Sequence, residues 1–157
     1  MLVLLALVAG GCGKSKSVPK AAPDPAQAVG ARAKTLYHGS EWSVVTRGDH
    51  AWALHLVGGR WRVDHSGRVA IRILGPQPDG HAPRTPQVAV ELIAPTRLVD
   101  SALWVDGMEL QLKGGGSATR GTIYGAPSPP LAPGKHVAVG YARTATTASV
   151  VAWSFAV

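Results

Sequence analysis

Apolar residues alternate with polar or small ones along most of residues 36–157, and no stretch sustains the apolar spacing of a helix. The alternation is clearest at the C-terminal end, in residues 148–157. There one face carries the large apolar side chains and the other carries small ones; the large ones are Val151, Trp153, Phe155 and Val157. Because a half-buried strand needs a sheet to pair with, this pattern predicts an all-β fold.

The Gly58–Gly59 pair predicts a tight hairpin turn between residues 52–57 and 60–65, since both turn residues must adopt φ > 0. In that register His55 points away from His65, so the two histidines cannot share a metal ion. The apolar side chains of the hairpin lie on the face opposite His55, and His65 lies with them. This face comprises Trp52, Leu54, Leu56, Trp61, Val63 and His65.

A second hairpin is predicted at Asp106–Gly107, between residues 102–105 and 108–112. Its register places Trp104 and Glu109 on the face opposite the apolar pairs. Further short strands are expected wherever the alternation resumes, at residues 41–46, 68–74, 87–93, 119–124 and 136–142.

Short strands separated by turn residues predict an antiparallel β-sandwich. Residues 75–86 are rich in proline and predict a crossing without regular structure, and Gly114–Ser117 predict a flexible loop. One register is left open. A two-residue turn at Ser66–Gly67 would set the apolar side chains of strand 68–74 against the wrong face, so either that loop has an odd length or the strand crosses to a second sheet.

The chain begins with an apolar run, MLVLLALVAGGC, that ends in small residues and the single cysteine, Cys12. This run resembles the signal peptide of a bacterial lipoprotein. The resemblance implies removal of residues 1–11 and lipidation of Cys12. Because Gly13 rather than aspartate follows, it also implies sorting to the outer membrane. The alternative is a buried N-terminal strand with a cysteine in the core.

The formal net charge of +7 is concentrated near the N-terminus, since residues 13–35 hold five basic residues and one acid. These residues are also poor in large apolar side chains, which predicts that residues 12–35 form a disordered, basic tether. Such a tether suits an anionic membrane or wall polymer. The remaining chain shows no basic stripe interleaved with aromatic residues, so nucleic acid is not an expected partner.

About half of the chain, residues 84–157, contains a set of short motifs: Thr85–Pro86, Val105–Asp106–Gly107, Tyr124, LAPGKH at 131–136 and WSFAV at 153–157. With these motifs it resembles a bacterial immunoglobulin-like domain of exported surface proteins. The resemblance implies an immunoglobulin-like β-sandwich over residues 36–157, with N-terminal strands at 36–75 and the immunoglobulin-like core at 84–157. It also implies a scaffold role. Such domains usually carry valines two and four residues after the histidine that corresponds to His136, and here Ala138 and Gly140 occupy these positions. The sequence therefore does not decide which face of strand 136–142 points into the core.

Residues that would carry catalysis are not arranged for it. Asp64, His65 and Ser66 are consecutive and point in alternating directions, unlike a catalytic triad. No glycine-rich phosphate loop precedes a helix. The sequence therefore predicts a non-catalytic protein without cofactor or metal, acting as a structural or protein-binding module of the cell envelope.

The five tryptophans suggest an alternative, carbohydrate binding. Trp61 and Trp153 fall on apolar faces and are expected in the core. Trp42 and Trp104 are the candidates for an exposed platform, with Glu109 as a partner for sugar hydroxyls. The competing interpretation, that the N-terminal hairpin covers Trp104, is the one we expect, because the tryptophans of that hairpin also need burial.

A periplasmic metal carrier is a further alternative, since small copper-carrying sandwiches also end in an F-x-V strand. The N-terminal histidine usual in such proteins is absent, and the two methionines form no cluster.

Overall fold

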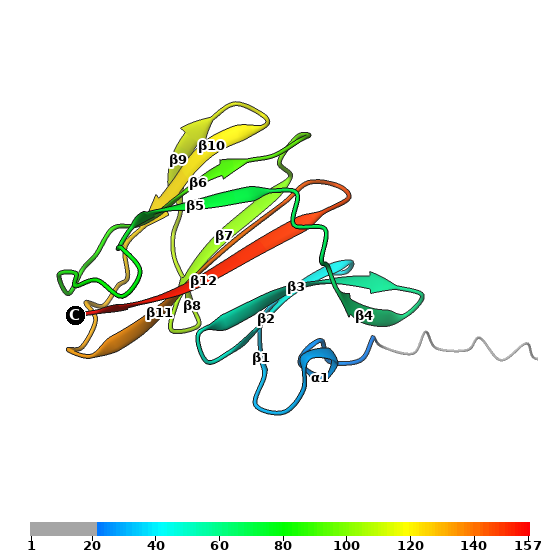
Figure 1. The fold of residues 1–157 in the computed structure, drawn as a ribbon, viewed down its shortest axis with the longest axis horizontal. Coiled ribbons are helices and arrows are strands. Elements are labelled where there is room, and N and C mark those ends of the chain that lie inside the picture. The colour runs from blue at the N-terminus through cyan, green and yellow to red at the C-terminus, as the bar shows by residue number, and fades with distance from the viewer. Residues whose placement is uncertain (1–21) are drawn as a thin grey trace, which may run out of the picture.

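The computed structural model describes residues 22–157 and contains three four-stranded antiparallel sheets and one short helix (Figure 1). Within that range, no helix is long and apolar enough to cross a membrane. Sheet A contains β1 (Lys34–His38), β2 (Trp42–Arg47), β3 (His50–Val57) and β4 (Arg60–Val63). Sheet B contains β5 (Ala70–Gly75), β6 (Val88–Ile93), β9 (Lys113–Gly116) and β10 (Arg120–Gly125). Sheet C contains β7 (Asp100–Val105), β8 (Met108–Glu109), β11 (Lys135–Arg143) and β12 (Ala148–Ala156).

Sheets B and C form an immunoglobulin-like β-sandwich. Their strand orders, β5-β6-β10-β9 and β12-β11-β7-β8, reproduce the two sheets of an immunoglobulin domain, with β8 added beside β7. The sandwich therefore begins at β5, which lies within the range 36–75 predicted for the N-terminal strands. The chain crosses from sheet A to sheet B at residues 64–69. Of the two alternatives left open for strand 68–74, the crossing to a second sheet is therefore confirmed.

The sandwich core lies between sheets B and C. Trp153 is 4% exposed, and its indole N–H donates to the Pro76 carbonyl at 3.0 Å. The prediction that one face of the closing strand enters the core is confirmed, because Val151, Phe155 and Val157 pack there with Trp153. The other buried members of this core include Val88, Val90, Leu92, Leu103, Val105, Leu110, Leu131, Ala138 and Ala142.

Sheet A packs on the opposite face of sheet C and forms a third layer (Figure 1). This layer explains the open register of β11. Ala138 and Ala142 face sheet B, whereas Val139 and Tyr141 face sheet A. Both faces of β11 are thus buried, so apolar side chains occupy both sets of alternating positions.

The far face of sheet A is covered by the residues before β1, including α1 (Ala26–Val29). The Trp61 indole N–H donates to the Pro23 carbonyl at 2.7 Å, and the Asp24 carboxylate accepts from the Ala26 amide at 3.0 Å. The prediction of a disordered tether is therefore wrong for residues 24–35, because they bury the apolar face of sheet A. Residues 1–21, with the predicted signal peptide and Cys12, lie outside the described residues.

Both predicted hairpin turns are confirmed. Gly58 and Gly59 have φ of 58° and 74°, and Leu56 pairs with Trp61. The second strand is shorter than the predicted 60–65, because β4 ends at Val63, where the chain leaves for sheet B.

The Asp106–Gly107 turn likewise pairs Trp104 with Glu109. The loop predicted at Gly114–Ser117 is wrong, since β9 (Lys113–Gly116) is an edge strand of sheet B. Its glycines lie so close to β10 that an added Cβ at Gly114 or Gly116 would overlap the backbone of β10.

Asp64 joins sheet A to the sandwich. Its carboxylate accepts from the Ser66 amide at 2.8 Å, the Ala148 amide at 3.0 Å and the Thr147 hydroxyl at 3.4 Å. The Ser66 hydroxyl also bonds to that of Thr147. Burial acts to raise the pKa of Asp64, but the hydrogen bonds from Ala148, Ser66 and Thr147 outweigh it and lower this pKa.

His136 connects the start of β11 to the β7–β8 turn. Its Nδ1 lies 2.7 Å from Asp106 Oδ2, and its Nε2 lies 2.8 Å from the Ala132 carbonyl oxygen. With an acceptor at each ring nitrogen, the doubly protonated imidazolium is favoured. The hydrogen bond to Asp106 raises the pKa of His136, although burial opposes the shift.

We predict that Trp153→Ala lowers the free energy of unfolding by about 3–5 kcal/mol, because it leaves a cavity in the sandwich core. Urea titration of the full-length protein measures this. Val99→Ala is the control: Val99 is 48% exposed, and its truncation should change stability by less than about 0.5 kcal/mol. Equal effects from the two variants would contradict the core position of Trp153.

We also predict that His136 makes stability depend on pH. Because its folded pKa is raised, its stabilisation is fully present below about pH 6.5 and is lost as the pH rises through the folded pKa. NMR titration of the His136 ring should give a midpoint above about 6.5, and Asp106→Asn should lower that midpoint. A wild-type midpoint below the ordinary value would show that burial, rather than the ion pair, dominates.

Candidate functional site

The predicted tryptophan platform is not at the surface. Trp42 is 2% exposed and Trp104 is 1% exposed, because both are enclosed between sheets A and C. The Trp42 ring stacks on His55 with centroids 4.2 Å apart and an angle of 3°. Glu109 is exposed and pairs with Trp104, whose ring is buried. The interpretation that the N-terminal strands cover Trp104 is therefore confirmed. Neither Trp42 nor Trp104 is accessible for stacking on a sugar ring.

The interface between sheets A and C also encloses two phenols. Burial is the main cause that raises the pKa of both Tyr37 and Tyr141, and the charge of Asp100 adds to it. The Tyr141 hydroxyl and the Trp42 indole N–H are buried without a hydrogen-bond partner among the described residues. The raised pKa values keep both phenols protonated near neutral pH.

Trp52 is the tryptophan that keeps partial exposure. It lies on β3, with the Arg47 guanidinium 5.4 Å from its ring centroid and the His50 ring 6.1 Å away. Trp52 also contributes to the wall of a groove of about 460 Å³ between β3, the 63–71 segment and β12. We call this the junction groove. The aliphatic side chains of Val63, Ile71 and Val151 also line it.

Of the three consecutive residues Asp64, His65 and Ser66, the first two line the junction groove. The carboxylate of Asp64 and the hydroxyl of Ser66 both hold the β11–β12 turn. The exposed His65 side chain makes no hydrogen bond to another described residue. Asp64 and Ser66 therefore form a structural joint, and His65 is paired with neither of them as a catalytic base would be.

β12 forms the floor of the junction groove and is an edge strand of sheet C. Both ends of its free edge are sealed. The Ala148 amide donates to Asp64 at 3.0 Å. At the other end, the Ala156 amide donates to the Gly80 carbonyl at 2.8 Å, and the Ser154 carbonyl accepts from the Asp79 amide at 2.7 Å.

The middle of this edge is open. Alternate residues of an antiparallel strand direct their N–H and C=O groups to the same side. Ala148 and Ser154 direct theirs away from β11, so Val150 and Ala152 between them do the same. In the described part of the chain, neither residue has a backbone partner on that side. The β12 edge thus has unpaired backbone donors and acceptors at Val150, which lines the junction groove, and at Ala152, the next residue that faces the same side.

A second hollow region lies at the opposite edge of the sandwich, where the chain crosses from β8 to β9. It consists of hollows of about 370 and 380 Å³ that share Gln111 and Ala126. We call it the crossover groove. The larger hollow is lined by Thr85, Gln87, Gln111, Lys113, Tyr124, Gly125 and Ala126. The smaller one is lined by Met108, Glu109, Leu110, Gln111, Ala126 and Ser128.

The banks of the crossover groove follow from alternation. Pro86 and Val88 are buried, so Thr85 and Gln87 are exposed. Residues 109–113, in the β8–β9 crossover, alternate in the same way. Leu110 is buried and Leu112 is half-buried, whereas Glu109, Gln111 and Lys113 are exposed. The segment can lie against β10 because residue 125 is glycine; an added Cβ would be 2.9 Å from the Gln111 carbonyl oxygen.

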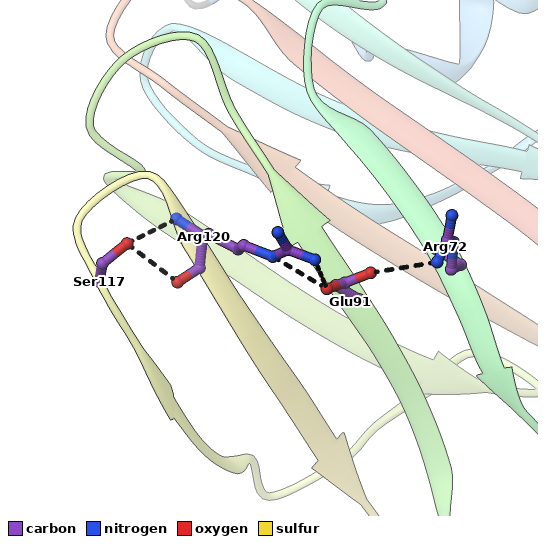
Figure 2. A network of polar contacts seen from close by, with 4 residues as sticks. All are labelled: Arg72, Glu91, Ser117 and Arg120. Atoms are coloured by element: carbon purple, nitrogen blue, oxygen red, sulfur yellow. Dashed lines mark hydrogen bonds and ion pairs between the residues drawn. The ribbon is translucent and has the colours of Figure 1, made fainter.

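The outer face of sheet B is exposed and carries a small ionic network (Figure 2). Glu91 accepts from Arg120 at 2.6 Å and lies 3.7 Å from Arg72. The hydrogen bond from Arg120 is the main cause that lowers the pKa of Glu91. The two arginine side chains are exposed and flank Glu91, whose side chain is 17% exposed, so these ion pairs contribute little to stability.

Sequence reasoning missed both grooves. The alternation that exposes Gln87 and Gln111 is visible in the sequence, but their proximity depends on the pairing of β6 with β10. No local signal marks β12 as an edge strand. Among residues 22–157, no three His, Cys, Asp or Glu side chains are grouped as in a metal site.

No sequence model of a known protein family matches this chain, and no curated protein sequence matches it. Among solved structures, it is similar to tandem immunoglobulin domains of titin, with a TM-score of 0.37 and 5% identity, over 76% of this chain and 74% of that one. The described part of the chain is an immunoglobulin-like β-sandwich with an additional N-terminal sheet, as its strand order shows.

Proposed function

We propose that this chain is a non-catalytic, lipid-anchored protein of the bacterial cell envelope whose immunoglobulin-like domain is a protein-binding module. The observation that carries the proposal is the open edge of β12 in the junction groove. Unpaired backbone groups at Val150 and Ala152 match an extended strand of another polypeptide, which would extend sheet C by one strand.

The walls of the junction groove support strand addition. In an added strand, alternate side chains point to opposite sides. One side would meet Trp52 and Val63 near sheet A, and the other would meet Ile71 near β5. Backbone pairing supplies affinity and these apolar contacts supply selectivity. The sealed ends of β12 limit the added strand to a short segment.

We predict that Ala152→Pro abolishes partner binding without unfolding the domain. Proline removes the backbone N–H that faces the groove, whereas the ladder to β11 uses the neighbouring residues. Ala152→Ser is the matched control, because it keeps the N–H and nearly the same volume. A photo-cross-linking amino acid at exposed His65 reports contact in intact cells.

The expected result is a discrete adduct with an envelope protein in the wild type and in Ala152→Ser, absent in Ala152→Pro. Circular dichroism and urea titration check that both variants fold. Val150→Pro provides a second test of the same edge. Identical adducts in all variants would contradict strand addition at β12.

The proposed anchor is a lipidated Cys12, with residues 1–11 removed as a signal peptide. Each buried CH₂ of an acyl chain contributes about 0.8 kcal/mol, so several chains hold a protein on a bilayer. Gly13 after the cysteine supports sorting to the outer membrane, by resemblance to Gram-negative lipoproteins. The membrane is then the first partner, and an envelope protein is the second. The proposal includes no cofactor, metal or nucleic acid.

We predict that Cys12→Ser releases the protein from the membrane fraction. Intact mass spectrometry of the wild-type protein should show a chain that starts at Cys12 and carries acyl groups. Ser17→Ala is a control that leaves the cysteine in place. A mature mass without lipid, or unchanged membrane fractionation of Cys12→Ser, would contradict the anchor.

A further inference from the structure

The crossover groove is a second surface, distinct from the junction groove and not used by the proposed function. It lies between the residues that precede β6, the end of β10 and the β8–β9 crossover, whereas the junction groove lies over β3 and β12. Its floor is formed by Tyr124, Gly125 and Ala126, of which two have little or no side chain. The half-buried Tyr124 ring is therefore the one large side chain among these three residues.

The polar side chains of the larger hollow are free. Among the described residues, none of Thr85, Gln87, Gln111 and Lys113 donates or accepts a side-chain hydrogen bond, and Lys113 has no acidic partner within salt-bridge distance. In the junction groove, by contrast, the Asp64 carboxylate is fully engaged by hydrogen bonds within the domain. A hollow that combines an aromatic side chain with a few unengaged polar groups has the composition of a ligand site.

The chemical types present fit a sugar. A glutamine amide offers both a donor and an acceptor, so Gln87 and Gln111 can bond to neighbouring hydroxyls of one ring. An aromatic side chain supplies an apolar face with a polar hydroxyl at its tip, which suits stacking against the C–H face of a sugar. Lys113 adds a donor for a hydroxyl or a carboxylate. The hollow lacks the large apolar side chains that an apolar peptide anchor would need.

We infer that the crossover groove is a carbohydrate-binding site, in which Tyr124 stacks on a sugar ring while Gln87 and Gln111 bond to its hydroxyls from the two banks. The adjoining hollow at Glu109 and Ser128 extends the site, so an oligosaccharide rather than a single sugar is the ligand class. The site does not require an open β12 edge or a lipid anchor.

The test is titration calorimetry of full-length protein with three hexasaccharides: cellohexaose, chitohexaose and an alginate hexamer. The first two are neutral and the third is a polyuronate. Binding of at least one is expected. Gln87→Ala and Gln111→Ala, both exposed and outside the core, should each weaken it by up to about tenfold. Tyr124→Leu should weaken it about tenfold or more by removing the aromatic face.

Two controls separate this site from the others. Arg72→Ala lies on the outer face of the same sheet but outside the groove, and Ala152→Pro lies in β12, away from the crossover groove. Both should leave sugar affinity unchanged. Lys113→Ala distinguishes the ligand charge, since it should weaken a polyuronate more than a neutral oligosaccharide. Failure of all three sugars to bind, or binding that the Gln87, Gln111 and Tyr124 variants leave intact, overturns the inference, whatever the outcome at β12.

Discussion

The arrangement depends on one constraint: sheet C is buried on both of its faces. Sheet B covers one face and sheet A covers the other, so strands β7, β11 and β12 carry apolar or small side chains at both sets of alternating positions. Trp104 illustrates this. It points away from the sandwich core, where an immunoglobulin-like sheet would ordinarily meet water, and is 1% exposed because Trp42 and Val44 of sheet A cover it.

The third layer needs a rigid joint, and Asp64 supplies it. The chain must leave β4 early to reach sheet B, and the Asp64 carboxylate connects this crossing to the β11–β12 turn. The crossing seals the start of the β12 edge, and residues 79–82 seal its end. The same geometry that attaches sheet A therefore leaves Val150 and Ala152 open between two closed ends. Edge strands usually avoid such exposure.

The two grooves differ in what they offer. The junction groove presents backbone groups between apolar walls, which suits a polypeptide strand. The crossover groove presents side-chain amides around one aromatic ring, which suits a glycan. They lie on different edges of the domain, so occupation of one does not require the other. Asp106 and His136 fix the β7–β8 turn that leads into the crossover groove.

The sequence by itself determined the strands and the hairpin turns, because both depend on neighbouring residues. Period-two alternation marks β12, and the paired glycines 58 and 59 adopt the positive φ that such a turn needs. Only the tertiary structure decided which faces are covered. Trp42 and Trp104 have the same local pattern whether exposed or buried, and residues 24–35 order only because sheet A offers them an apolar face. Gln87 and Gln111 approach each other, and β12 becomes an edge, through pairings between strands distant in sequence, which no local pattern specifies.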